Sequence, residues 1–291
     1  MRRWAASLAT ALALAVSGCA AELPDGIDGD LTNGWSPPPA AKQWRPVANY
    51  CHPDLADEST LDDWHPAVCQ TPHIAETVLV ADLAGVPAGS SAAANRGRAF
   101  RECSRRITGW LGGDWRTGWL VLQPVMPSRQ AWEGGARWFR CDLAETSPAD
   151  GDLVRRSGSL KGALKTGTVR MTCADPTIEG ERVTGMRPVP CAGKHTSEFA
   201  GIFESRKSSV DALTSAELQK GCHAAIAEFT GIPNDGTVRN RVGWLGFPPD
   251  DASWKLGDRA IRCFLWLNGE KMTGSYRNAG TRKLKIHYVY R

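Results

Sequence analysis

Two histidine–glutamate pairs are the residues whose types and spacing could carry chemistry. His73 precedes Glu76 by three positions, and His195 precedes Glu198 in the same way. Such a pair could hold a metal ion or act as a base with its orienting partner. In an extended segment, however, residues three apart point to opposite faces, so the two cannot cooperate locally. A buried histidine–carboxylate hydrogen bond would explain the motif structurally, and binding of a ligand or partner is the third interpretation.

A tryptophan followed five positions later by an arginine also occurs twice. The two pairs are Trp132 with Arg137 and Trp254 with Arg259. Each arginine could stack on an aromatic face or meet an anionic polymer. The alternative is that each tryptophan anchors a turn against the core. The chain has 12 tryptophans and 4 tyrosines, so a sugar-binding aromatic surface is a further possibility.

Common catalytic motifs are missing from the sequence. There is no Gly-x-Ser-x-Gly, Ser-x-x-Lys, His-Glu-x-x-His or Gly-x-x-x-x-Gly-Lys. We therefore expect no enzyme, no catalytic residue, no cofactor and no metal. The competing hypothesis is a hydrolase or metal-dependent enzyme that uses the two histidine–glutamate pairs.

A repeated cysteine frame indicates the elements that must position these residues. Successive cysteines of the first frame are 18, 34 and 38 positions apart, and those of the second are 18, 31 and 41 apart. None of these spacings is Cys-x-x-Cys, which argues against zinc and thioredoxin-like chemistry. In an exported chain the frames indicate four disulfides. The frame consists of Cys51, Cys69, Cys103, Cys141, Cys173, Cys191, Cys222 and Cys263.

The start of the chain predicts export. A basic Met1-Arg2-Arg3 precedes a short apolar stretch and the small residues Ser17 and Gly18, as in a secretory signal. The stretch is shorter than the roughly 20 residues that cross a bilayer as a helix. We expect a signal peptide over residues 1–18, lipidation of Cys19 and a flexible linker over residues 19–48. Ordinary cleavage after Ala21 is the alternative.

Composition and length predict a soluble globular protein with two domains. Apolar residues make up 42% of the chain and charged residues 23%, close to the usual proportions. The formal net charge of +4 is small and forms no basic stripe, so nucleic acid is not an expected partner. We place the two repeats at residues 49–163 and 164–291.

Hydrophobic patterning predicts the same elements in both repeats. Apolar residues at helical spacing indicate one amphipathic helix each: Phe100, Cys103, Ile107 and Trp110, then Leu218, Cys222, Ile226 and Phe229. Thr214-x-x-Glu217 is a capping box at the start of the second helix. Strands are expected over residues 76–83, 119–125, 137–143, 242–247, 261–267 and 283–290. The fold class is α+β, with two tandem homologous domains, each a small, mostly antiparallel sheet with one main helix.

Placement of the cysteines on these elements suggests their pairing. The helix cysteines Cys103 and Cys222 lie on apolar faces, above strands that contain Cys141 and Cys263. We expect these pairs to staple helix to sheet, while Cys51–Cys69 and Cys173–Cys191 close surface loops. Four cysteines allow three pairings in each repeat, so the pairing is a hypothesis.

The shared motifs resemble a known family. They are Cys-x-x-x-His-x-x-Glu, Pro-x-x-x-x-Trp-x-x-Gly-x-Arg-x-x-x-Cys and a closing Gly-Ser-x-basic segment, and the resemblance they carry extends over both repeats, about four-fifths of the chain. This set is similar to the septum-formation domain of actinobacterial envelope proteins. The resemblance implies an exported, membrane-linked module associated with cell division, and it brings no catalytic mechanism.

Taken together, we expect a non-catalytic, lipid-anchored protein at the outer face of the cytoplasmic membrane. Its partner would be an envelope protein or a cell-wall component, bound by residues among the histidine–glutamate and tryptophan–arginine pairs. A glycan-binding module that uses exposed tryptophans is the other non-enzymatic alternative.

Overall fold

A computed structural model describes residues 44–287 of the chain, apart from residues 57 and 63. The predicted signal peptide, Cys19 and residues 19–43 of the predicted linker lie outside the described residues. We refer to residues 44–163 as the first half and to residues 164–287 as the second half. Both halves belong to one compact unit.

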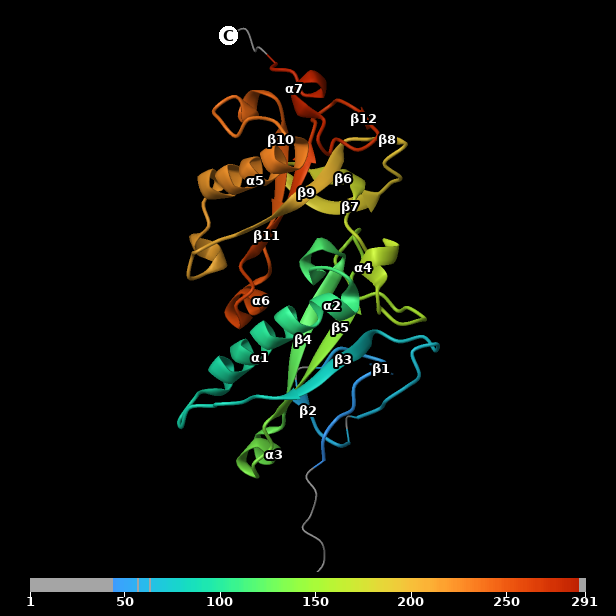
Figure 1. The fold of residues 1–291 in the computed structure, drawn as a ribbon, viewed down its shortest axis with the longest axis vertical. Coiled ribbons are helices and arrows are strands. Elements are labelled where there is room, and N and C mark those ends of the chain that lie inside the picture. Colours follow the sequence, from blue (N-terminus) through green and yellow to red (C-terminus); the bar gives the residue numbers. More distant parts are fainter. Residues whose placement is uncertain (1–43, 57, 63, 288–291) are drawn as a thin grey trace, which may run out of the picture. The chain divides into compact units, whose positions relative to one another are not determined.

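The first half is built on a five-stranded sheet (Figure 1). Its strands, in spatial order, are β1 (Tyr50–His52), β3 (Ala75–Asp82), β5 (Trp138–Glu145), β4 (Leu120–Pro127) and β2 (Glu58–Ser59). All neighbours are antiparallel except β2, which runs parallel to β4. Helix α1 (Ala92–Arg106) packs on β4 and β5. Phe100 of this helix lies in the hydrophobic core of this half.

The second half contains another five-stranded sheet, which is antiparallel throughout. Its order is β10 (Gly243–Phe247), β11 (Ala260–Trp266), β9 (Ser197–Glu204), β6 (Cys173–Glu179) and β7 (Arg182–Pro188). Helix α5 (Ser215–Thr230) covers β9, β10 and β11 (Figure 1). A separate pair is formed by β8 (Lys194–His195) and β12 (Met272–Thr273).

Four strands correspond between the halves. The order β1-β3-β5-β4 matches β6-β9-β11-β10, but the fifth strand lies at opposite edges. In the first half β2 is added to β4, whereas in the second half β7 is added to β6. The mixed helices and antiparallel sheets confirm an α+β protein; the division into separate domains at residue 163 stays a prediction.

The second main helix begins at the predicted capping residue, whereas the first ends at Arg106, before the predicted helix position Trp110. Thr214 caps α5 by accepting a hydrogen bond from the Glu217 backbone N–H at 3.2 Å. The side chain of Glu217 does not return the second bond of the capping box, because it accepts the Ser205 hydroxyl at 2.7 Å. Gly231 ends α5 with φ of 72°, in the left-handed region that glycine adopts without strain.

Short elements complete the described chain. They are α2 (Thr108–Leu111), η1 (Trp115–Thr117), α3 (Arg129–Glu133), α4 (Ala163–Thr166), η2 (Val210–Ala212), η3 (Val238–Asn240), α6 (Asp251–Leu256) and α7 (Gly280–Lys283). None of the helices in this part of the chain is long and apolar enough to cross a membrane.

The predicted strand over residues 283–290 is wrong for its first five positions. Lys283 is the last residue of α7, and no strand follows up to His287; residues 288–290 lie outside the described part. Leu284 is buried in a cluster with Val238 and Val242. The apolar side chain at position 284 therefore anchors this segment to the core without strand pairing.

All four expected disulfides are present. Cys103–Cys141 joins α1 to β5, and Cys222–Cys263 joins α5 to β11. The other two bonds, Cys51–Cys69 and Cys173–Cys191, each span 18 positions and tie a loop to the first strand of its half.

Candidate functional site

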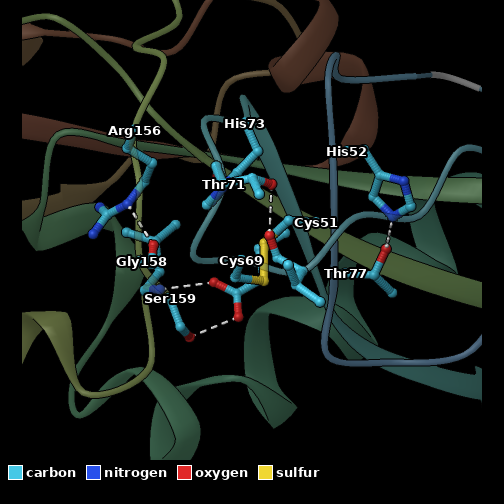
Figure 2. The surroundings of a disulfide bond; sticks show 12 residues. Cys51, His52, Cys69, Thr71, His73, Thr77, Arg156, Gly158 and Ser159 are labelled. Carbon is cyan, nitrogen blue, oxygen red and sulfur yellow. Dashed lines mark hydrogen bonds between the residues drawn. A yellow bond between two sulfur atoms is a disulfide. The ribbon is translucent and has the colours of Figure 1, made fainter.

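Glu76 is a buried carboxylate that fixes a distant turn. It lies on β3, yet it accepts the Ser159 hydroxyl and the Leu160 backbone N–H, both at 2.7 Å. Ser159 approaches this carboxylate beside the Cys51–Cys69 disulfide (Figure 2). The turn starts at Gly158, whose φ of 90° favours glycine. The Gly-Ser segment that closes the first repeat is thus fixed to the sheet by this glutamate.

Glu198 does the same in the second half. It accepts the Ser275 hydroxyl at 2.5 Å and the Tyr276 backbone N–H at 2.7 Å. Gly274, with φ of 74°, starts this turn. The sequence shows the glutamate and the Gly-Ser segment as separate repeated motifs, and the structure joins them into one contact.

The histidines hold the same closing segments through their backbones. His73 exchanges two backbone hydrogen bonds with Arg156, at 2.8 and 2.9 Å, and His195 pairs with Met272 between β8 and β12. Each ring nitrogen Nδ1 lies 2.8–2.9 Å from a carbonyl, that of Thr71 or Gly193. Because a carbonyl only accepts, Nδ1 carries the proton and donates it. The neutral tautomer then leaves Nε2 as an acceptor.

The expected buried histidine–carboxylate hydrogen bond is wrong for both pairs. The glutamate oxygens are occupied by the Gly-Ser turns, and both Nε2 atoms are buried without a hydrogen-bond partner among the described residues. In each motif, the histidine backbone and the glutamate side chain therefore hold the closing segment separately, and the two side chains do not bond to each other.

The second histidine–glutamate pair forms a potential metal-ligand set together with a cysteine. Atoms of Cys173, His195 and Glu198 lie within 4.8 Å of one another. However, the Cys173 sulfur is bonded to Cys191, and zinc binds the thiolate form of cysteine. Both oxygens of Glu198 also accept hydrogen bonds already. The donor set does not fit a metal while this disulfide is intact.

Each repeated arginine stacks on its tryptophan. The Arg137 guanidinium carbon lies 4.5 Å from the Trp132 ring centre, and the corresponding distance from Arg259 to Trp254 is 4.6 Å. Each arginine also donates a hydrogen bond to the backbone carbonyl of its tryptophan, closing the turn after α3 or α6. Trp254 is 1% exposed, so its ring is a core anchor rather than a binding platform.

A buried polar network in the first half was not anticipated from the sequence. The His52 Nε2 atom lies 2.9 Å from the Thr77 hydroxyl, which donates to Asp142 at 2.7 Å. Arg140 forms an ion pair with Asp142 at 3.0 Å, and both side chains are at most 3% exposed. Trp64 covers the network, 5.0 Å from the Arg140 guanidinium.

Burial sets the ionisation of this network. Desolvation, with the Arg140 charge as the next cause, lowers the pKa of His52 to about 3. Desolvation raises the pKa of Asp142 to about 6, against the stabilising effects of Arg140 and Thr77. At neutral pH the histidine is therefore neutral and the carboxylate is ionised.

The second half replaces most of this network with aromatic rings. Phe199 and Phe264 stand 122 positions after Thr77 and Asp142, and their ring centres lie 5.4 Å apart. Arg262 stands at the position of Arg140. An arginine at this position in both repeats is the signal that the sequence carries for this face, but the neighbours that determine its role differ between the copies.

The two halves meet through a charged contact. Arg116 donates to Asp258 at 2.8 Å, and both side chains are largely buried. Arg262 donates to the backbone carbonyls of Arg116 and Leu120, both at 3.1 Å. A cavity of about 480 Å³ lies beside this contact and is lined by Trp119, Arg262 and residues 146–151 among others.

Comparison with known proteins gives one result. No curated protein and no solved structure matches the chain. A protein family described as septum formation matches residues 48–263 in one continuous span that includes both cysteine frames. This span is well over half of the chain, and it contains both histidine–glutamate pairs and both tryptophan–arginine pairs described above. The chain therefore belongs to the septum formation family.

Proposed function

We propose that this chain is an exported, lipid-anchored and non-catalytic envelope protein that binds a protein or wall component during septum formation. The observation that carries the proposal is the family match over residues 48–263. The four disulfides support it, because disulfides persist in oxidising, extracytoplasmic environments.

The arrangement of the repeated polar residues supports a non-catalytic role. Glu76 and Glu198 use their oxygens to hold backbone turns, and the histidine rings are buried. A general base must reach a substrate proton within hydrogen-bond distance. We therefore assign these four residues to folding rather than to a hydrolase site.

The membrane attachment is proposed at Cys19. A short apolar stretch followed by Ser17, Gly18 and Cys19 is typical of a lipoprotein signal. Replacement of Cys19 by alanine should move the protein from the membrane fraction to the soluble extracytoplasmic fraction. Replacement of Ser17 by alanine, which keeps a small residue, is the matched control and should leave the protein in the membrane fraction.

We also propose that the chain arose by duplication of one α+β domain, with copies at residues 49–163 and 164–291. The shared strand order and the identical placement of the disulfides support this. Limited proteolysis that cuts near residue 163 and releases two folded fragments would support two separable domains, and degradation without such fragments would count against them.

Septal binding is tested by location and capture together. A fluorescent fusion to the anchored protein should concentrate at the division site, and affinity capture from envelope extracts should enrich a wall fragment or an envelope protein. An even distribution over the envelope with no enriched component would contradict the proposal. The control is a fusion carrying only residues 1–48, which keeps the proposed anchor without either half.

A further inference from the structure

The features that differ between the two halves converge on one cavity. Strand β7 has no counterpart in the first half. The first copy has 17 positions from Cys141 to Gly158 where the second has 11 from Cys263 to Gly274, so its extra residues lie in the segment that contains positions 147–151. The two features touch, because the Met186 backbone N–H donates to the Pro148 carbonyl at 2.7 Å. A Cβ atom added at Gly185 would lie 2.2 Å from the Ala149 carbonyl oxygen, so only glycine allows this approach.

Both features form walls of the junction cavity. Its volume of about 480 Å³ lies within the range of about 300–1,000 Å³ that is usual for small-molecule sites. Apart from Arg262, the repeated side chains described above are already used to hold turns and core. A site made from the unrepeated elements can occur only once in the chain.

The floor of the cavity combines carboxylate and guanidinium groups. Asp258 and Arg262 line it, and Arg116 beside them is paired with Asp258. Arg116 also lies 3.5 Å from Asp114, so two guanidinium groups face two carboxylates. Burial lowers the pKa of Arg262, and the Asp258 charge opposes this effect. The groups are thus shielded from water, where hydrogen bonds to a ligand compete least with solvent.

This floor offers both donors and acceptors. Arg262 uses Nε and Nη2 for backbone carbonyls, and no hydrogen bond from the described residues uses its Nη1. Asp258 accepts its bonds from Arg116 and Ala260 through Oδ1, which leaves Oδ2. Hydroxyl groups suit such a pair because each can donate to the carboxylate and accept from the guanidinium.

The walls are aromatic and held in place. Trp119 stacks on Phe264 with 6.2 Å between ring centres, and Phe247 meets the same ring edge-on at 5.6 Å. Trp119 and Phe247 line the cavity, together with the buried Trp115. Fixed aromatic rings offer flat apolar surface at low entropic cost, which suits a ligand with an apolar face and a hydroxylated edge.

We propose that this cavity binds a neutral saccharide of one or two rings. An anion is disfavoured because Asp150, Asp250 and Asp258 all line the cavity against a single arginine. A cation is disfavoured because the three carboxylates are already engaged: Asp258 is paired with Arg116, and Asp150 and Asp250 each accept a backbone N–H. The inference rests on the proposed envelope-binding role and identifies the wall component as sugar.

The test compares matched sugar rings on the full-length protein with its disulfides intact. Glucose, glucuronate and glucosamine share one ring and differ in charge, and chitobiose and cellobiose extend the neutral series. Binding is followed by calorimetry and by the indole N–H resonances of Trp119 and Trp115. We expect a neutral probe to bind and to shift these resonances, and the charged analogues to bind at least about tenfold more weakly, or about 1.4 kcal/mol.

The location is tested at Thr184, an exposed residue of β7 that lines the cavity. Thr184→Trp should obstruct the cavity and weaken binding at least about tenfold, whereas Thr184→Ser should bind like the parent. Because the position is exposed, both variants should keep the parent melting temperature.

Three results would overturn the proposal. The first is no response to any neutral probe at about 10 mM, a concentration at which a Kd of about 1 mM gives near-full occupancy. The second is equal or tighter binding of a charged analogue. The third is undiminished binding by a folded Thr184→Trp variant. A protein that fails these tests but still concentrates at the septum would refute the saccharide site alone. Sugar binding without envelope or septal enrichment would refute the septal role alone.

Discussion

Replacing either buried glutamate by glutamine should destabilise the protein to a similar degree in both halves. The variants are Glu76→Gln and Glu198→Gln. Each carboxylate accepts one hydroxyl and one backbone N–H, and each is at most 4% exposed. A glutamine has nearly the same shape but only one accepting oxygen, so its NH₂ group must face one of the two donors.

The expected cost follows from these two contacts. A hydrogen bond to a charged group contributes roughly 1.5–3 kcal/mol, and leaving a buried donor unpaired costs roughly 1–3 kcal/mol. With one bond lost and the other made neutral, we expect each variant to lose about 3 kcal/mol of unfolding free energy. For a chain of this size the melting temperature should fall by roughly 6–12 °C.

The assay is thermal and urea unfolding of oxidised protein at neutral pH. Glu133→Gln is the control, because Glu133 forms an exposed, solvent-screened pair with Arg129 that should contribute little to stability. Parent-like stability of both buried variants would refute the structural role of the glutamates. Loss of envelope binding in a variant of unchanged stability would assign that glutamate to function instead.

Three further predictions follow from single contacts. His52→Gln should reduce acid sensitivity: the folded-state pKa of about 3 lies below the unfolded value, so His52 contributes stability that is lost as pH falls below about 6.5, about 2 kcal/mol by pH 5. Asp142, with its pKa raised to about 6, gains stability as the pH falls and should offset about 1 kcal/mol of the His52 loss. Urea unfolding of the parent and of His52→Gln at neutral pH and at pH 5 measures the change in acid sensitivity. The double variant Cys222→Ala, Cys263→Ala lacks one disulfide and should lose about 4 kcal/mol of unfolding free energy by the loop-entropy estimate, measured by urea unfolding without reductant. Arg259→Ala should cost about 1–2 kcal/mol in a thermal melt through the lost carbonyl bond and ring contact, while Arg259→Lys should cost less.

Local patterns predicted much of the fold. The five strands expected between residues 76 and 267 are found within a few positions, because alternation and helical periodicity report which side of an element is buried. The cysteine pairing was also predictable. Once Cys103 lies on the buried face of a helix and Cys141 on a strand beneath it, few other geometries remain.

Contacts between distant residues were not predictable in the same way. The hydrogen bond from the Leu160 backbone to Glu76 joins residues 84 positions apart, and the hydrophobic periodicity of the sequence does not predict such a contact. The hairpin of β6 and β7 was missed because its strands are largely exposed, with Glu179 and Arg182 at the turn. Burial on one face is the signal that sequence patterns carry, so exposed strands give little of it.

The buried pair of Arg140 and Asp142 shows how function can be separated from stability in the first half. Breaking a buried ion pair costs roughly 3–5 kcal/mol, but replacing both partners with apolar residues is often neutral or stabilising. Arg140→Met alone should therefore be destabilising, because it removes the charge that favours ionised Asp142, and the buried carboxyl must then stay charged without a partner or take up a proton. Adding Asp142→Phe introduces the residue that the second half has at this position, and it should restore most of the loss in urea unfolding.

The outcome of this pair decides why the network is retained. The Arg140 atoms Nε and Nη1 are buried without hydrogen-bond partners among the described residues, so the network is not optimal for stability. If the double variant is as stable as the parent but no longer captures its envelope partner, selection has kept these charges for binding. If the double variant is as unstable as Arg140→Met, the aromatic substitution does not fill the site and the argument from the second half is refuted. A stable Arg140→Met would show that Asp142 takes up a proton at little cost once Arg140 is removed.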